Sequence, residues 1–315
     1  SVYGSFGILT KEEMLEVKQD FKRLSIGLPK ESSFQENRIS LTPDAVSLLV
    51  HNGHKIVIES NAGEGANFTD KEYLHAGAEI VFSKEEVYQS DVVVKIEPPT
   101  ETEMKLLKKD QQLISAIQLN TREKKYFKSL LDKNVTSIAI EHIRDEEGKL
   151  PLLRSMSEIA GTSSLLIASE YLSNINKGKG LILGGITGIS PTDIVIIGAG
   201  TVGEYACKTA IGLGANVRVF DTSLSKLKRL EDISNRNIST SLIVPKILRK
   251  ALRRSDVVVG ALRSGDGRTP CVVSEEMVKD MKESSVIIDV SIDAGGCFET
   301  SEVTSHKDPV FTKHG

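Results

Sequence analysis

The chain has 315 residues, which is more than one ordinary hydrophobic core holds and enough for two domains. Apolar residues make up 39% of the chain and charged residues 26%, a balance that excludes an intrinsically disordered protein. The net charge of −3 provides no basic surplus for a nucleic-acid partner.

Five strands are predicted in the first half of the chain, after about 20 polar residues that predict an arm or a helix. The strands are expected at 24–28, 55–59, 91–96, 113–117 and 136–140. A helix begins after Thr42, because Thr42 is a favoured N-cap and Pro43 a favoured first helical residue. Further helices are expected near 100–108 and 121–132. Strands that alternate with helices predict a parallel sheet covered on both faces.

A second alternating series follows a long predicted helix at 157–174. Its strands are expected at 192–197, 216–220, 256–259 and 285–290. We place the domain boundary inside the long helix and the glycine-rich segment 178–188, which gives a first domain at 1–156 and a second at 157–315. The predicted class is therefore α/β, with two Rossmann-like domains that each contain a parallel sheet.

Cysteine content and hydropathy argue against a disulfide-rich protein, a metal-binding protein and a membrane protein. Cys207, Cys271 and Cys297 are few and widely spaced, so we predict no disulfide framework, no metal site and a reducing, cytoplasmic location. Cys297 has no evident base partner and is interpreted as a packing residue. No apolar run approaches the ~20 residues of a membrane helix, and the first residues lack the apolar core of an export signal. We therefore expect no membrane partner.

The strongest local signal is a glycine-rich turn with the spacing GxGxxG, formed by Gly198, Gly200 and Gly203. The turn follows an apolar strand and precedes a helix expected at 204–213, and the next strand ends at Asp221. A lone GxGxxG is a weak signal, but this whole context is typical of a dinucleotide-binding unit. The alternative is a glycine turn that binds no ligand.

Each part of the turn has a physical role in holding a dinucleotide. The first glycine allows the tight turn, the second leaves room for a pyrophosphate, and the third lets the helix pack close to the strand. The N–H groups of the first helical turn, at Thr201 and Val202, would face the phosphates. Asp221 can accept hydrogen bonds from both ribose hydroxyls and would repel a 2′-phosphate, which favours NAD over NADP.

Five further motifs accompany this turn, in the same order as in one known family. They lie at 27–31 (GLPKE), 37–43 (NRISLTP), 62–66 (AGEGA), 156–161 (MSEIAG) and 288–299 (IDVSIDAGGCFE). With these motifs the chain resembles the alanine dehydrogenase and nicotinamide nucleotide transhydrogenase α-subunit family over about 24–315. The last motif resembles alanine dehydrogenase more than transhydrogenase.

The resemblance implies two Rossmann-like domains with a cleft between them, NAD as cofactor, and reversible oxidative deamination of L-alanine to pyruvate and ammonia. It also implies a homo-oligomer, commonly a hexamer. Family chains continue past the position that matches Gly315 and return to the first domain. We therefore expect the present sequence to lack that return segment.

Two site residues carry over directly from the family. An arginine in the Arg38 context grips the substrate carboxylate, a task that suits the fork of a guanidinium. The alternative for Arg38 is a surface ion pair with Glu36 or Glu31. The catalytic aspartate of the family falls at Asp293, after a predicted strand, where ligands bind in open α/β sheets. The alternative for Asp293 is a helix cap.

Two other positions depart from the family. Alanine dehydrogenases carry a lysine two positions after the one that matches Lys95, and here that position is Glu97. They carry a proton-transferring histidine where this chain has Gln118. A glutamine amide performs no general acid–base catalysis, and Glu97 reverses a charge that polarises the keto oxygen. We expect alanine chemistry to be weakened, or routed through Asp293, Lys95 or Glu97, with Lys95 as a candidate substrate-binding residue.

Further cofactor contacts follow from the family at Ser157 and Leu262, with Asp293 also near the cofactor. Arg263 and Arg268 either meet an anion or lie in a solvated loop. The histidines at 51, 54, 75 and 142 do not match the family's catalytic position and are interpreted as surface or hydrogen-bonded residues. The basic stretch 246–254 predicts the solvated face of a helix rather than a binding patch.

Three functions remain open on the sequence. The first is an alanine dehydrogenase-type enzyme acting on a small amino or keto acid. The second is an NAD oxidoreductase with another substrate, or hydride transfer of the transhydrogenase type, which needs no proton-handling pair. The segment 151–154 lacks the glutamine-containing loop of the transhydrogenase branch. The third is a non-enzymatic NAD-binding module.

Overall fold

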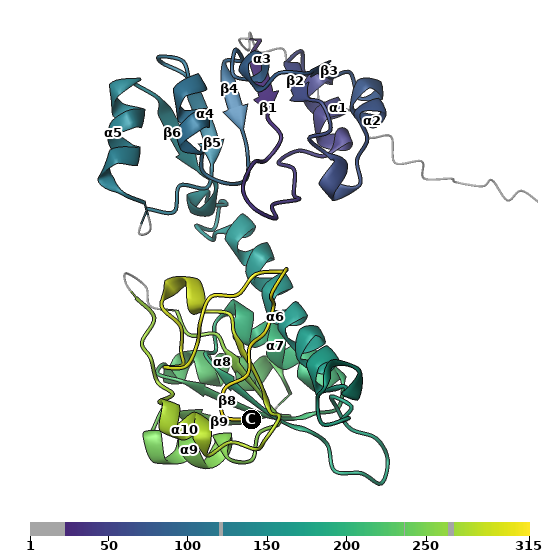
Figure 1. Cartoon of the computed structure of the whole chain (residues 1–315), viewed down its shortest axis with the longest axis vertical. Coiled ribbons are helices and arrows are strands. Elements are labelled where there is room, and N and C mark those ends of the chain that lie inside the picture. Colours follow the sequence, from purple (N-terminus) through teal and green to yellow (C-terminus); the bar gives the residue numbers. More distant parts are fainter. Residues whose placement is uncertain (1–22, 120–121, 236, 264–267) are drawn as a thin grey trace, which may run out of the picture. The chain divides into compact units, whose positions relative to one another are not determined.

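The computed structural model describes residues 23–119, 122–235, 237–263 and 268–315 (Figure 1). The predicted N-terminal arm lies outside the described residues. The chain divides into two compact units, one ending at Ile140 and the other beginning at Glu141.

The first unit is built on a six-stranded parallel sheet with the order β3-β2-β1-β4-β5-β6 (Figure 1). Its strands are β1 (Ser25–Leu28), β2 (Lys55–Glu59), β3 (Glu79–Val81), β4 (Val92–Val94), β5 (Gln112–Ser115) and β6 (Thr136–Ala139). The chain passes from β1 outward to β3 and then crosses back to β4, so β1 and β4 are neighbours. This reversal of strand order is the place where open α/β sheets bind ligands.

Helices connect these strands, and several begin at caps that the sequence provides. Thr42 caps α1 by accepting a hydrogen bond from Ala45, with Pro43 as the first helical residue, as predicted. Thr100 and Glu103 form a capping box at the start of α4. The helices are α1 (Pro43–His51), η1 (Glu64–Ala66), α2 (Asp70–His75), α3 (Lys84–Val87), α4 (Glu101–Leu106), α5 (Lys124–Asp132) and η2 (Ile140–His142).

The second unit contains a five-stranded parallel sheet with the order β11-β10-β7-β8-β9. Its strands are β7 (Asp193–Ile197), β8 (Asn216–Asp221), β9 (Ser239–Leu242), β10 (Val257–Gly260) and β11 (Val286–Asp289). Its helices are α6 (Pro151–Leu172), η3 (Asn174–Asn176), α7 (Thr201–Gly212), α8 (Leu224–Ile233), α9 (Pro245–Leu252), α10 (Glu275–Lys279) and η4 (Ile292–Ala294). Helices α6 and α7 pack side by side (Figure 1).

Apolar side chains from alternate strand positions form a core on each face of both sheets. In β7, Ile194 and Ile196 belong to one cluster, while Val195 and Ile197 belong to the other. Two clusters likewise cover the first sheet. Burial on both faces explains why the central strands are almost continuously apolar. The predicted α/β class with two Rossmann-like parallel sheets is confirmed.

Several elements differ from the sequence expectation, among them β4, which covers only Val92–Val94 of the expected 91–96. Helix α6 begins at Pro151 rather than at 157, because proline fits the first helical turn. The edge strands β3 and β9 were not predicted from the sequence. Both are short and partly exposed, so they lack a clear apolar pattern. Among the described residues, no helix is long and apolar enough to span a membrane.

Candidate active site

Three predicted site residues follow neighbouring strands of the first sheet. Arg38 lies in the loop after β1, Glu97 follows β4, and Gln118 follows β5. The carboxyl ends of parallel strands meet at one edge, so the topology gathers these residues beside the reversal between β1 and β4. Glu97 contacts both Arg38 and Gln118, so the three side chains form one polar cluster.

Arg38 is held by two carboxylates. Its Nε donates to Oε1 of Glu36 at 2.8 Å and its Nη2 donates to Oε2 at 2.5 Å, which is a bidentate pair. The same Nη2 lies 3.6 Å from Oε1 of Glu97. The hydrogen bonds from Arg38 lower the pKa of Glu36 and raise that of Arg38. The ion pair between Arg38 and Glu36, predicted as the alternative for Arg38, is therefore present.

Gln118 connects the cluster to a second arginine. Its Nε2 donates to Oε2 of Glu97 at 3.2 Å, and Nη2 of Arg122 donates to its Oε1 at 3.1 Å. The Gln118 backbone has φ of +53°, a left-handed conformation that is uncommon outside glycine. The amide thus orders Glu97 on one side and Arg122 on the other. Arg122 was not singled out from the sequence, because its pairing depends on this loop conformation.

Lys95 has a different environment from Glu97. Its Nζ is fully buried and lies 2.9 Å from Glu103 and 3.3 Å from Glu31. Glu31 also accepts a hydrogen bond from the backbone N–H of Ile96 at 2.5 Å. These contacts tie the loop after β1 to the end of β4. The structure therefore gives Lys95 an internal ion-pairing role, and its contact with substrate stays a prediction.

The two carboxylates that share Lys95 titrate differently. Burial acts to raise the pKa of Glu103, but the ammonium of Lys95 and hydrogen bonds outweigh it and lower that pKa to about 2. For Glu31 burial prevails, and its pKa is raised. One ammonium thus stabilises two buried acids unequally.

In the second unit, the glycine turn has the geometry expected from its spacing. Gly198 has φ of +119°, and a Cβ there would lie 2.4 Å from the carbonyl oxygen of Ala261. A Cβ at Gly203 would lie 1.8 Å from the carbonyl oxygen of Gly198. Larger side chains are excluded at both positions by close backbone packing.

Gly200 differs from these two glycines. Its φ is −77°, which any residue adopts, and a Cβ there would meet no atom within 4 Å. It is the N-cap of α7, and no side chain caps this helix. The first-turn N–H groups, including those of Thr201 and Val202, have no acceptor within the helix. Open space in front of an uncapped helix N-terminus fits the pyrophosphate of a dinucleotide.

Asp221 lies against the same turn. Its Oδ2 accepts a hydrogen bond from the N–H of Ala199 at 2.7 Å, and its Oδ1 accepts one from the N–H of Ser223 at 2.7 Å. The side chain is buried at the end of β8. Each carboxylate oxygen can accept more than one hydrogen bond, so this arrangement orients Asp221 and leaves acceptor capacity for a ribose.

Glu204 is a residue of this site that sequence reasoning missed. It is buried in the first turn of α7, where its oxygens lie 2.7 Å from Lys208 and 2.7 Å from Arg229. Arg229 also donates to the carbonyl oxygen of Ala199 at 3.3 Å. Burial acts to raise the pKa of Glu204, but these hydrogen bonds lower it. An acid in the first helical turn was the available signal, since the helix dipole favours it there.

The remaining predicted residues belong to the second unit. Leu262 and Asp293 lie in loops at the edge of the sheet that carries the glycine turn, and Ser157 lies on α6. Leu262 follows β10 and is buried, and its carbonyl oxygen accepts a 2.6 Å hydrogen bond from Ser291. Asp293 is exposed within η4, after the neighbouring strand β11, so it is not the N-cap of that helix. Because β10 also neighbours β7, these loops share the edge that carries the glycine turn. Ser157 lies on α6 and donates to the carbonyl oxygen of Leu153.

The loop around the candidate anion-binding arginines is only partly described. Arg263 is exposed at the end of the described segment, and 264–267 lie outside the described residues. Arg268 packs against Gly295, where a Cβ would lie 2.5 Å from Arg268 Cγ.

Cys297 is buried, and burial raises the pKa of its thiol to about 11, as expected for a packing residue. Among the described residues, no cluster of acids, histidines or cysteines forms a metal site.

Two parallel sheets of Rossmann-like order, one with a glycine-rich turn before an uncapped helix, define a dinucleotide-binding type of α/β protein. Family models described as alanine dehydrogenase/PNT, N-terminal domain and C-terminal domain match residues 27–160 and 164–315. An alanine dehydrogenase of Staphylococcus epidermidis is 40% identical over 93% of this chain and 79% of its own length. The chain belongs to the alanine dehydrogenase/PNT family.

Solved structures agree with this assignment. An L-alanine dehydrogenase is 37% identical, with a TM-score of 0.87 over 92% of this chain and 80% of its own. A transhydrogenase from Sinorhizobium meliloti is 22% identical, with a TM-score of 0.77 over 88% of this chain and 81% of its own. The second likeness concerns the fold alone.

Proposed function

We propose that the chain is an NAD-dependent oxidoreductase that acts on a small amino or keto acid, with alanine as the first candidate. The observation that carries this proposal is the open space at Gly200, between a turn of close-packed glycines and the uncapped start of α7. Family membership supports NAD as the cofactor, which supplies the hydride acceptor. We propose that the unit with Arg38 binds substrate and that the unit with Gly200 binds NAD.

Each remaining residue has a proposed task. Arg38 binds the substrate carboxylate, in competition with Glu36 and Glu97. Asp293 orients water or ammonia, or balances the positive charge of a developing iminium group. Asp221 accepts hydrogen bonds from the ribose diol. Ser157 and Leu262 line the cofactor. We also propose that the chain forms a homo-oligomer, a hexamer by analogy with the family, and that it is located in the cytoplasm.

Gly200→Ala should fold normally and lose NAD affinity. Its φ of −77° and the open space around it remove any strain in the free protein, while the added methyl would occupy the space assigned to the pyrophosphate. We expect NAD affinity to fall by about tenfold or more in calorimetry, because phosphate contacts to backbone N–H groups would be lost.

Gly212→Ala is the matched control, because Gly212 also has open space and lies at the end of the same helix. It should leave NAD affinity unchanged. Equal NAD affinity in both alanine variants would contradict the placement of the pyrophosphate at Gly200.

The enzymatic proposal predicts alanine-dependent NADH formation that is lost in Asp293→Asn. The amide keeps the shape of the side chain but removes its negative charge and replaces one acceptor oxygen by an N–H donor. Absorbance at the NADH band measures the rate. Asp308→Asn is the control, because Asp308 is another exposed acid of the same unit. Turnover that survives in Asp293→Asn at the wild-type rate would remove Asp293 from the catalytic site.

A second candidate function is an oxidoreductase with an altered substrate, and it is supported by Glu97 and Gln118, which are hydrogen-bonded to each other where alanine dehydrogenases are expected to carry lysine and histidine. The Arg38–Glu97 pair favours an amino acid over a keto acid as the ligand of this cluster. A cation and an anion 3.6 Å apart are complementary to a zwitterion, with the ligand carboxylate toward Arg38 and its ammonium toward Glu97. A keto acid offers no cation to Glu97 and meets an extra negative charge. A non-enzymatic NAD-binding module remains the third candidate, and it predicts NAD binding without saturable turnover.

A further inference from the structure

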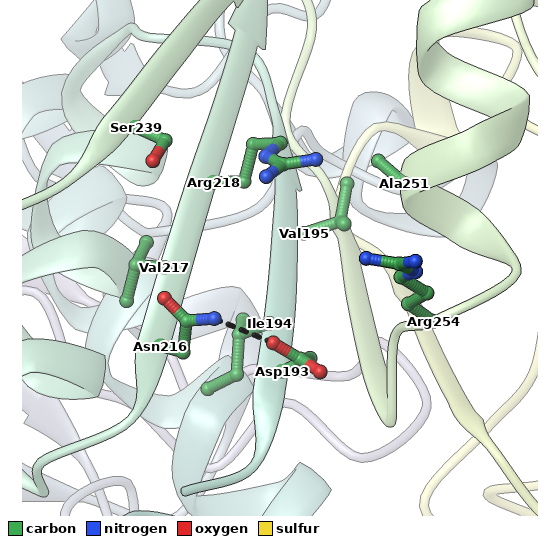
Figure 2. A pocket seen from close by; sticks show the side chains of 9 residues that line it. All are labelled: Asp193, Ile194, Val195, Asn216, Val217, Arg218, Ser239, Ala251 and Arg254. Carbon is green, nitrogen blue, oxygen red and sulfur yellow. Dashed lines mark hydrogen bonds between the residues drawn. The ribbon is translucent and has the colours of Figure 1, made fainter.

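A small cavity opens at the amino ends of β7 and β8, at the opposite edge of the second sheet from the glycine turn. Its volume is about 260 Å³, and Figure 2 shows the side chains that line it. Strand residues form its floor and the end of α9 forms its side. The lining residues are Asp193, Ile194, Val195, Asn216, Val217, Arg218, Ser239, Ala251 and Arg254.

Arg218 is an exposed strand residue that lines the cavity. By register it stands beside Val195 on one side and Ser239 on the other. Val195 belongs to the core cluster that packs against α9, whereas the Arg218 side chain on the same face is exposed to solvent. Its guanidinium is therefore accessible to a small ligand at the cavity.

Arg254 provides a second guanidinium at the same cavity. It follows the end of α9, and Figure 2 shows its guanidinium and that of Arg218 extending from opposite sides toward the space in front of Val195. Two like charges at one small cavity repel each other unless an anion lies between them.

Two other arginines at the end of α9 do have a carboxylate partner. Arg249 and Arg253 both pair with Asp280, at 2.5 and 2.9 Å. Across the described ranges, neither Arg218 nor Arg254 has an acid within ion-pairing distance. The acid in the cavity wall, Asp193, instead accepts a hydrogen bond from Asn216 at 2.6 Å.

We propose that Arg218 and Arg254 form a binding site for a small oxyanion with two negative charges, such as a phosphate or a short dicarboxylate. Two guanidinium forks match the oxygens of such a group bidentately, and the Ser239 hydroxyl adds a donor at the rim. A volume of about 260 Å³ suits a group of this size and excludes a whole dinucleotide. The site is separate from the glycine turn, so it stands independently of the proposed enzymatic function.

The test titrates the whole chain with inorganic phosphate in a calorimeter at pH 7.5 and constant ionic strength. We expect saturable binding that weakens by about tenfold in Arg218→Gln and in Arg254→Gln, because each variant removes charged hydrogen bonds. Lys250→Gln is the control, since it removes an equal charge from an exposed position of α9 and should leave affinity within about twofold. Sulfate and succinate, titrated separately, distinguish a phosphate site from a dicarboxylate site.

Three results would overturn the proposal: no saturable heat with any of the three anions, equal weakening in Lys250→Gln, or full binding in both arginine variants. Arg218→Lys retains the charge and the aliphatic stem, so it separates a loss of contact from a loss of folding. It should fold as the wild type and bind phosphate more weakly than the wild type. NAD affinity should be unchanged in all four variants, which keeps this test distinct from that of the glycine turn.

Discussion

The double variant Glu97→Lys/Gln118→His should form NADH from alanine about 10² to 10⁴ times faster than the wild type, the range typical of general acid–base catalysis. Histidine titrates near neutral pH and can exchange protons with the amine, whereas the Gln118 amide cannot. Lysine at 97 would place a cation beside Arg38, where the structure now has an anion 3.6 Å away. The measurement is the initial rate of NADH formation at saturating NAD.

A charge reversal elsewhere in the same unit controls for non-specific electrostatics. Glu101 is an exposed acid at the start of α4, so Glu101→Lys should leave the rate unchanged. The single variants should gain less than the double, because Glu97 and Gln118 are hydrogen-bonded to each other. No gain in the double variant, with NAD affinity intact, would favour an altered substrate over weakened alanine chemistry.

Lys95→Met should destabilise the first unit by about 3–5 kcal/mol, the usual cost of removing one partner from a buried ion pair. The methionine fills a similar volume, but it leaves the carboxylates of Glu31 and Glu103 buried without their shared cation. Urea unfolding followed by circular dichroism measures the loss in the free energy of unfolding.

The pH dependence of this loss has a definite sign. Burial already raises the pKa of Glu31 and Lys95 acts to lower it, so without Lys95 that pKa lies still further above its unfolded value. The stability that this group contributes is then present below its unfolded pKa and is lost as the pH rises through its folded pKa. The variant should therefore be less stable at pH 8 than near pH 5. Lys105→Met, at an exposed position of α4, should cost little. If the two variants unfold at the same urea concentration, the buried ion pairs contribute nothing to stability.

The bounds of strands and the positions of caps and turns could be predicted from the sequence where they depend only on residues of one short segment. Strand β2 has the predicted bounds, and α1 begins at its predicted N-cap. The glycine turn was also located correctly from its spacing. Gly203 is constrained by the backbone of Gly198 in the same turn, whereas Gly198 is constrained by Ala261, which follows β10. The edge strand β9 was missed, because its polar segment pairs on one side only and carries no apolar pattern.

The candidate site was predicted less completely, because its partners come from distant segments. Arg38, Glu97 and Gln118 were each singled out, and the structure joins them through Glu97. The sequence did not indicate Arg122 or the burial of Lys95, since both depend on loops rather than on regular elements. Strand β4 ends at Val94, so the alternation of strand side chains no longer predicts where residues 95 and 97 point.

The sequence by itself determined the fold class, the family and the glycine turn, because each is encoded in local patterns of apolar, glycine and capping residues. Only the tertiary structure decided which charges meet. It placed Lys95 between two buried acids, set Glu97 beside Arg38, and brought Arg218 and Arg254 to one cavity. The physical reason is that ion pairs depend on distance in space, and the crossovers of a parallel sheet bring together residues that are far apart in the chain.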